Sequence, residues 1–330
     1  SAGTTETYLP MLFKNAFGGA YQSAFYVQNV DPSGPANVSI EFYGQDGVAI
    51  CSLDSVVQPL ASKGWWIPGV SCLPSTWVGS AVVRSNRNIV AVGRPHVGNE
   101  VMTYNGFSSG NTTAYLPMLF KNAFSGGAYK SAFYVQNIDD WNSANVTIKY
   151  YNESGILSCT ANVVIPPMAS IGYWLPSVGC LPDGWVGGVE VTSNQTIIAV
   201  GRPHIEAQIT TYNGFTFGST ESFVPMLFKN AFTAGSYKSA FYIQNLSASA
   251  NANITIKYYN STGTLGCSVT DTISKLASKG YWLPSVSCLL NGWVGGVVVT
   301  SDQPVVTVGR PHIGAQITTY AGFSAGSENP

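Results

Sequence analysis

Arginine and histidine recur two positions apart in a Gly-Arg-Pro-His motif, at 93–96, 201–204 and 309–312. Residues two apart on a strand face the same side, so this pair could bind an anion or act as an acid and a base. A catalytic histidine needs a carboxylate to orient it, but no acidic residue keeps its place in every copy, and Glu100 gives way to Gln208. No nucleophile elbow or phosphate-binding loop is present. We predict that the protein is not an enzyme and that the motif clamps a domain boundary, with ligand contact as the alternative.

Six cysteines form the second set of reactive residues, and they fall as two per copy, always 21 positions apart. Pairing within a copy closes a loop of about 20 residues, which contributes roughly 3 kcal/mol in the chain-entropy model. Metal binding needs four ligands, whereas each copy offers two cysteines and one histidine without a CxxC spacing. The predicted disulfides are Cys51–Cys72, Cys159–Cys180 and Cys267–Cys288, with no metal and no cofactor. Disulfides indicate an oxidising location, either secreted, extracellular or on the cell surface.

These residues recur because the whole sequence is a threefold repeat with a period of 107 to 108 residues. The decamer YLPMLFKNAF stands at 8–17 and 115–124, and FVPMLFKNAF stands at 223–232. A period of this length is a complete domain, not a solenoid unit that needs neighbours to bury its face. The predicted domains are 1–107, 108–215 and 216–330.

Each copy has the pattern of an all-β domain. Val38, Ile40 and Phe42 alternate with polar or outward residues, and Gly-bearing turns such as YNESG follow at regular spacing. About seven short strands in 108 residues are typical of an immunoglobulin-like β-sandwich, with a small barrel as the alternative. The proline of YLPMLF fits a first strand at a sheet edge. We expect three tandem immunoglobulin-like sandwiches arranged in a rod.

Repeated polar and aromatic residues have predicted structural roles. Lys14-Asn15 and Gln28-Asn29, with their equivalents in the other copies, are expected to pin strand ends. Tryptophan recurs at three equivalent places, which we expect in the core, and each follows an aromatic residue expected to face outward. An outward aromatic row could stack on sugar rings or lie between subunits. The tryptophans are Trp66, Trp174 and Trp282, and the preceding residues are Trp65, Tyr173 and Tyr281.

The composition narrows the range of partners. Only 9% of the residues are charged, 45% are hydrophobic, and the formal net charge is −1. No basic field is available to attract nucleic acid, and no stretch has the apolar length of a membrane span. A largely neutral surface favours cover by a partner, a neighbouring copy or glycan.

Asn-X-Ser/Thr sequons occupy the same place in all three copies, at Asn37, Asn145 and Asn253. Each begins a strand whose alternate residues face solvent, so these asparagines are candidate glycosylation sites. The alternative is an ordinary strand-edge asparagine beside a β-favouring residue.

The two ends of the chain lack the polar, atypical repeats that close most tandem arrays. If the decamer packs against the preceding domain at each internal boundary, the first copy presents an unfilled surface and the third copy presents its mate. A head-to-tail contact that does not close makes an open polymer of copies of the chain. The residues predicted for this subunit joint are Tyr8, Leu9, Pro10, Met11, Leu12 and Phe13 at one end, and Arg310, His312, Tyr320 and Phe323 at the other.

The runs SAFYVQN, ANVTIKYY and LPDGWVGG, separated by Gly-bearing turns, resemble tandem β-sandwich repeats of secreted bacterial surface proteins and extracellular filaments. The resemblance spans each whole copy. It implies an immunoglobulin-like fold and an extracellular or cell-surface role, and it implies no activity. The resulting prediction is a structural subunit of a bacterial filament, sheath or surface layer. The alternatives are a secreted adhesin or carbohydrate-binding protein, and a non-catalytic part of a larger secreted enzyme.

Overall fold

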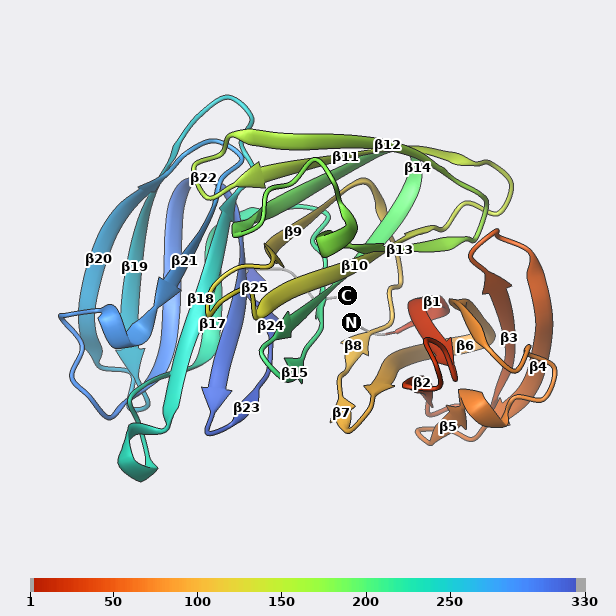
Figure 1. Ribbon diagram of the computed structural model, residues 1–330. Coiled ribbons are helices and arrows are strands. Elements are labelled where there is room, and N and C mark those ends of the chain that lie inside the picture. The colour runs from red at the N-terminus through yellow and green to blue at the C-terminus, as the bar shows by residue number, and fades with distance from the viewer. Residues whose placement is uncertain (1–2, 325–330) are drawn as a thin grey trace.

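The structure, a computed structural model, describes residues 3–324 and is almost entirely β. Its strands form three sheet systems that repeat one another, one for each copy of the sequence. The prediction of three tandem β-sandwich domains is confirmed (Figure 1). No helix among residues 3–324 has the length and hydropathy needed to cross a membrane.

The first domain shows the plan that the other two repeat. Its elements are β1 (Thr4–Lys14), β2 (Tyr21–Asn29), β3 (Ala36–Gly44), β4 (Ala49–Val57), β5 (Ser62–Trp66), the 3₁₀ turn η1 (Ile67–Gly69), β6 (Trp77–Val97), β7 (Glu100–Val101) and β8 (Tyr104–Asn105).

The second and third domains keep this order. The second contains β9 (Asn111–Lys121), β10 (Tyr129–Asn137), β11 (Ala144–Asn152), β12 (Leu157–Ile165), β13 (Ser170–Trp174), η2 (Leu175–Ser177), β14 (Trp185–Ile205), β15 (Gln208–Ile209) and β16 (Tyr212–Asn213). The third contains β17 (Ser219–Lys229), η3 (Thr233–Gly235), β18 (Tyr237–Asn245), β19 (Ala252–Asn260), β20 (Leu265–Ile273), β21 (Ser278–Trp282), η4 (Leu283–Ser285), β22 (Trp293–Ile313), β23 (Gln316–Ile317), β24 (Tyr320–Ala321) and β25 (Phe323–Ser324).

One 21-residue strand belongs to both layers of each sandwich. The first half of β6 pairs with β3 on one side and β1 on the other, and its second half pairs with β2 and β8. The chain stays extended through the polar run at 85–88, and there the strand passes from one layer to the other.

The core lies between the two layers. Phe25 on β2 meets Phe42 on β3 with ring centroids 6.3 Å apart, and Trp77 meets Phe42 at 5.9 Å. Trp65 stacks on Phe25 at 5.1 Å, whereas Trp66 is 44% exposed.

The predicted orientation of this aromatic pair is therefore wrong in every domain, since Trp174 and Trp282 are each 37% exposed while Tyr173 and Tyr281 stack inward. The pairing of β5 with β2 decides the matter, because it places Trp65 opposite Phe25 on the core side. A shift by one residue in a strand exchanges the two faces.

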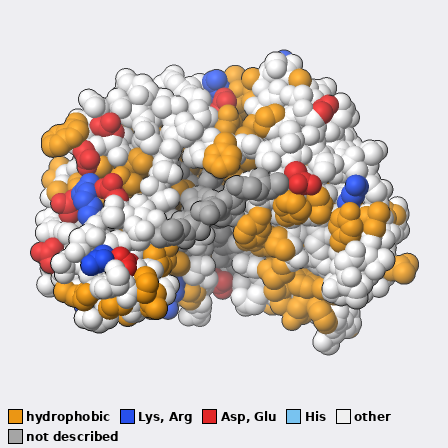
Figure 2. Space-filling model, turned by 180° about the vertical axis from the view of Figure 1, so that it is seen from behind, with side chains coloured by type: hydrophobic (Ala, Val, Ile, Leu, Met, Phe, Trp, Pro, Cys, Tyr) orange, Lys and Arg blue, Asp and Glu red, His pale blue; other side chains and the backbone are white. Residues whose placement is uncertain are grey.

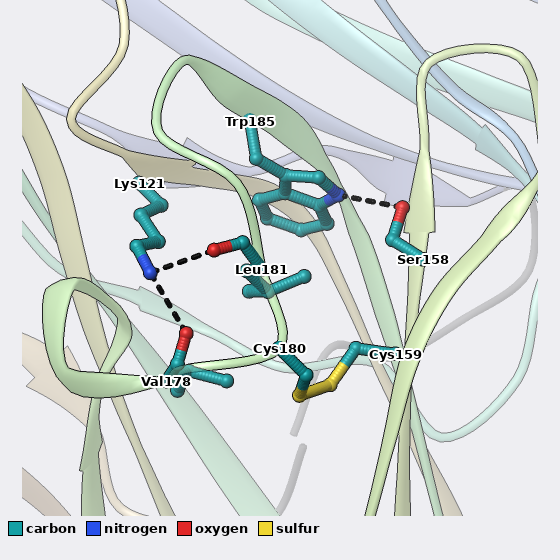
Figure 3. The surroundings of a disulfide bond; sticks show 7 residues. All are labelled: Lys121, Ser158, Cys159, Val178, Cys180, Leu181 and Trp185. Carbon is teal, nitrogen blue, oxygen red and sulfur yellow. Dashed lines mark hydrogen bonds between the residues drawn. A yellow bond between two sulfur atoms is a disulfide. The ribbon is translucent and has the colours of Figure 1, made fainter.

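All three predicted disulfides are formed, and a buried lysine fixes the segment that leads to each second cysteine. In the second domain the Lys121 ammonium donates to the carbonyls of Val178 (2.8 Å) and Leu181 (2.7 Å), next to Cys180 (Figure 3). Lys14 and Lys229 make the same two bonds in their domains. The predicted role of these lysines as polar pins is confirmed.

The three domains curve around a common centre, so the expected straight rod is replaced by an arch (Figure 1). The short strands β8 and β24 lie near this centre. Consecutive domains meet there through equivalent residues, 108 positions apart in sequence. A contact between equivalent positions requires that they lie close to the axis that relates one domain to the next.

Candidate functional site: the joint between domains

The chain contains the same joint twice, between the first and second domains and between the second and third. Its first element is a bulge in β1, where the register shifts between Leu9 and Leu12. Pro10 lies in this bulge, and its carbonyl accepts a hydrogen bond from Ser170 Oγ of the second domain at 2.6 Å. Ser278 of the third domain donates to the Pro117 carbonyl in the same way. The decamer repeated in sequence is therefore one half of the joint.

An arginine from the Gly-Arg-Pro-His motif forms the second element. The Arg202 guanidinium, 4% exposed, lies 5.7 Å from the Phe13 ring and 5.0 Å from the Tyr21 ring of the first domain, and 5.4 Å from Tyr134 of its own domain. Desolvated cation–π contacts of this kind contribute about 2 kcal/mol. The motif thus clamps a domain boundary through aromatic faces.

Arg310 repeats this clamp at the second joint. It lies 6.0 Å from Phe120 and 5.4 Å from Tyr129 of the second domain, and 5.5 Å from Tyr242 of its own domain. The rings also meet directly across both joints, Phe13 with Tyr134 at 5.8 Å and Phe120 with Tyr242 at 5.9 Å.

A ladder of equivalent residues near the centre forms the third element. Thr211 Oγ1 donates to the Thr103 carbonyl at 2.7 Å, and Thr319 Oγ1 donates to the Thr211 carbonyl at 2.9 Å. At the first joint, the Asn213 amide also bonds both backbone groups of Asn105. In each case the side chain comes from the later domain and the backbone from the earlier one, so the ladder has a direction.

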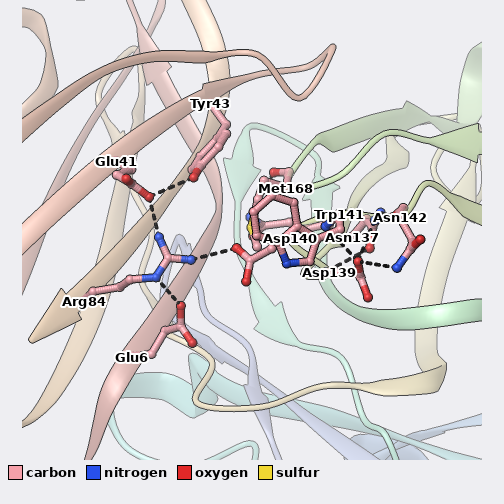
Figure 4. A network of polar contacts seen from close by, with 11 residues as sticks. Glu6, Glu41, Tyr43, Arg84, Asn137, Asp139, Asp140, Trp141, Asn142 and Met168 are labelled. Carbon is pink, nitrogen blue, oxygen red and sulfur yellow. Dashed lines mark hydrogen bonds and ion pairs between the residues drawn. The ribbon is translucent and has the colours of Figure 1, made fainter.

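Charged contacts differ between the two joints. At the first joint Arg84 pairs with Glu41, with Glu6 at 2.7 Å and, across the boundary, with Asp140 at 2.9 Å (Figure 4). At the second joint, a threonine and an alanine stand at the equivalents of Arg84 and Asp140. These side chains are about one-third exposed or more, so the network adds little stability. The backbone and aromatic contacts are therefore the common part of the joint.

The outer surfaces of the first and third domains show what the joint covers. The first domain exposes the residues that the second and third use at a joint: Tyr26 is 39% exposed, against 4% for Tyr134 and 5% for Tyr242, and Ser62 is exposed where Ser170 and Ser278 are 1% exposed. We name this the plug face, made of Tyr26, Ser62, Arg94, Thr103 and Asn105.

The third domain exposes the opposite half. Met226 is 38% exposed, whereas its equivalents Met11 and Met118 are fully buried, and Pro225 is exposed where Pro10 and Pro117 are buried. We name this the socket face, made of the exposed Pro225 and Met226 together with the neighbouring Phe228, Tyr237, Thr319 and Ala321, of which Phe228 and Thr319 are each 8% exposed. Few charged residues are available to any surface, since they make up 9% of the chain, and uncharged and hydrophobic side chains predominate on the face seen in Figure 2.

Most of the residues predicted for the free ends of the joint make their contacts inside the molecule instead. The first-domain segment Tyr8, Leu9, Pro10, Met11, Leu12 and Phe13 is buried throughout. Arg310 is 6% exposed in the second joint, and the Tyr320 hydroxyl bonds the Met226 backbone. His312 is half-buried beside Trp282. Phe323 pairs with Phe223 through its backbone but stays 45% exposed. The decamer faces the following domain and not the preceding one, so the open decamer is the third. This corrects the expected polarity.

The serine and threonine partners were missed at the sequence level. The only sign of them in the sequence was that the same residue occurs in all three copies. The serines stand in the repeated AS-x-G-x-W run, and the threonines are Thr103, Thr211 and Thr319. Hydroxyl residues are common in strands and loops, so identity between copies did not point to a contact. Their importance becomes visible only when the domains are placed side by side.

The histidines of the motif lie beside the joint, each against an exposed tryptophan. His312 meets Trp282 edge to face at 5.2 Å, and His204 meets Trp174 at 4.9 Å. Burial, followed by the charge of the neighbouring arginine, lowers the pKa of His312 to about 4 and that of His204 to about 3. Both rings are neutral at pH 7. Within residues 3–324, no group of His, Cys, Asp or Glu is arranged to hold a metal ion.

The sequon asparagines and one cavity complete the candidate sites. Asn37, Asn145 and Asn253 are exposed, as glycosylation would need. A cavity of about 490 Å³ lies where the three domains meet, and its described lining carries no charged side chain. The lining includes Thr103, Asn105, Thr211, Phe217 and Phe323, which offer hydroxyl, amide and aromatic groups.

Comparison with known proteins gives no family. No family model and no curated protein matches the sequence. Among solved structures, Thermotoga maritima 1070 is 18% identical and covers 32% of this chain and 94% of its own, with a TM-score of 0.28. A mutant of the major pilin from Streptococcus pyogenes is 8% identical. The match covers 91% of this chain and 98% of the pilin, with a TM-score of 0.21. A tetra-tandem repeat of a large adhesion protein is 12% identical. The match covers 89% of this chain and 66% of the repeat structure, with a TM-score of 0.15. Scores this low carry no functional argument.

Proposed function

We propose that this protein is a non-enzymatic structural subunit of an extracellular filament, sheath or surface layer, in which copies join head to tail. One observation carries the proposal: the chain builds the same joint twice and leaves its two different halves open, one on each outer domain. An interface between unlike faces propagates into a fibre unless its rotation closes a ring.

Two further features support an exported structural role. Each of the three domains contains one disulfide, as is usual for proteins in oxidising surroundings. The neutral surface has little charge repulsion to keep copies apart. Glycan on the exposed sequon asparagines is an additional proposal, which intact-mass measurement of native material would test.

Electron microscopy of the purified native protein over a range of concentrations tests the proposal. We expect fibres, or closed rings if the rotation returns on itself, that grow with concentration in neutral buffer. Single three-domain particles at every concentration would contradict a structural, self-assembling role. Removing residues 1–14 is unsuitable as a control, because β1 is an integral strand of the first sandwich.

A secreted carbohydrate-binding protein or adhesin is the second candidate. It is favoured by the exposed Trp66, Trp174 and Trp282, one per domain, and by the uncharged, hydroxyl-lined cavity. Aromatic faces with neutral polar groups suit sugar rings. Saturable binding of a neutral polysaccharide by particles that do not associate would favour this candidate over the first.

A further inference from the structure

We propose that the socket face of the third domain binds the plug face of the first domain of a second copy of this chain. The contact would repeat, residue for residue, the joint that the chain already forms twice. The inference rests on the proposed head-to-tail role and names its partner surface. It also reverses the end of the chain that the sequence indicated, since the receiving decamer is 223–232 and not 8–17.

The aromatic and arginine side chains at the outer part of the contact already have, in the single chain, the separations that they have in a filled joint. Arg94 lies 5.3 Å from the Tyr26 ring, which matches the 5.4 Å and 5.5 Å separations of Arg202 from Tyr134 and of Arg310 from Tyr242. On the socket face, Phe228 and Tyr237 are 5.4 Å apart, and Phe13 and Tyr21 in the filled joint are 5.3 Å apart. Because neither side must rearrange, little ordering entropy opposes the contact.

Superposing the internal joint on these faces assigns the new bonds. Arg94 would lie over the rings of Phe228 and Tyr237, as Arg202 lies over Phe13 and Tyr21. Ser62 would donate to the Pro225 carbonyl, as Ser170 donates to the Pro10 carbonyl. Met226, now 38% exposed, would be covered as Met11 is.

The inner part of the contact continues the threonine ladder. Thr103 is exposed, and its hydroxyl would donate to the Thr319 carbonyl of the other copy. The side chain of Asn105 is also exposed and would bond the backbone of Ala321, as Asn213 bonds the backbone of Asn105. Ala321 has no side-chain amide, but it would take part only through its backbone, because the first domain of the other copy supplies the Asn105 amide.

The identity of the occupant follows from the pattern that it must present. The equivalents of the socket face in the first and second domains are both filled. Each receives a serine, an arginine beside a tyrosine, and a threonine from the following domain. The plug face of the first domain presents these same groups at solvent. The two faces differ from each other, so the contact between them is heterologous and leaves one face of each kind open on the resulting pair.

Lysine substitutions on each face test the contact, each with a matched control. Ser62→Lys blocks the plug face, and Val56→Lys is its control, because the equivalent Val164 stays 59% exposed beside a filled joint. Met226→Lys blocks the socket face, and Leu290→Lys is its control, because the equivalent Pro182 stays exposed. We expect each blocking variant to weaken self-association by roughly 30-fold or more, as loss of an interface hot spot does, and each control to behave as the native chain.

Mixing the two blocked variants gives the sharpest result. Each retains one working face, so an equimolar mixture should form complexes of two copies and nothing larger, measured by sedimentation velocity. If the native chain associates but the blocked variants associate equally well, this contact is wrong and the structural role survives with another interface. If the native chain never associates, both proposals fall.

Asn105→Ala and Asn213→Ala provide a second pair that does not depend on a buried charge. Asn213 holds the internal joint, so its loss should lower the melting temperature of the single chain. Asn105→Ala should leave that temperature unchanged and weaken association several-fold. The reverse pattern would overturn the assigned ladder.

Discussion

The substitution Lys121→Met should destabilise the second domain by about 3 kcal/mol. The side chain is 6% exposed, and its ammonium donates to two carbonyls at 2.8 Å and 2.7 Å. Hydrogen bonds from a charged donor contribute about 1.5–3 kcal/mol each. Part of that gain is offset in the native domain by the cost of burying the charge, which the variant no longer bears. Methionine keeps the aliphatic packing, so the two lost bonds dominate the change.

For a domain of about 108 residues, 3 kcal/mol corresponds to a fall in melting temperature of roughly 10–15 °C. The measurement is urea and thermal unfolding, followed by tryptophan fluorescence. Amide exchange should also rise in 175–181, the segment that the lysine holds. The control is Lys130→Met, since Lys130 is only half-buried. A loss below about 1 kcal/mol would refute the reasoning, because it would mean that water satisfies both carbonyls as well as the ammonium does.

Three further outcomes are expected for the second domain. Replacing Cys159 and Cys180 together by serine should cost about 3 kcal/mol in urea unfolding, because the disulfide closes a 21-residue loop; an unchanged midpoint would contradict this. Gly187→Ala should destabilise by about 1–3 kcal/mol, because a Cβ there would collide with the Tyr151 carbonyl, whereas Gly179→Ala has open space and should be neutral. Burial, followed by the positive charges of Arg202 and Lys130, lowers the pKa of His204 to about 3, below the roughly 6.5 of an unfolded histidine. The neutral ring therefore stabilises the fold above pH 6.5, and this contribution is lost as the pH falls from about 6.5 toward 3. His204→Gln should flatten the loss of stability in that range, as urea melts at pH 7 and pH 4 would show.

Much of the fold follows from the sequence because its causes are local or periodic. Alternation with period two in segments such as 38–42 places one face of each strand in the core. The threefold repeat fixes the domain number, and two cysteines per copy leave one simple pairing. The lysine pins were predictable as well, since a charged residue retained inside an apolar strand needs partners.

Other features depended on which neighbours the strands acquired. The polar run 85–88 lies inside the long strand β6, which continues through it because β2 and β3 pair with its two halves in different layers. Trp65 and Trp66 are adjacent residues of the same type, so they point to opposite faces of β5. Only the pairing of β5 with β2 shows which of the two enters the core.

By itself, the sequence determined that three similar β domains, each with its own disulfide, follow one another and that the same surfaces recur in each. It did not determine which surface faces which neighbour, and here the expected polarity was wrong. Equivalent residues such as Tyr26 and Tyr134 have the same local sequence, but one is 39% exposed and the other 4%. The difference comes entirely from the presence of a preceding domain. Only the tertiary arrangement decides this, because burial is set by atoms more than a hundred residues away in the chain.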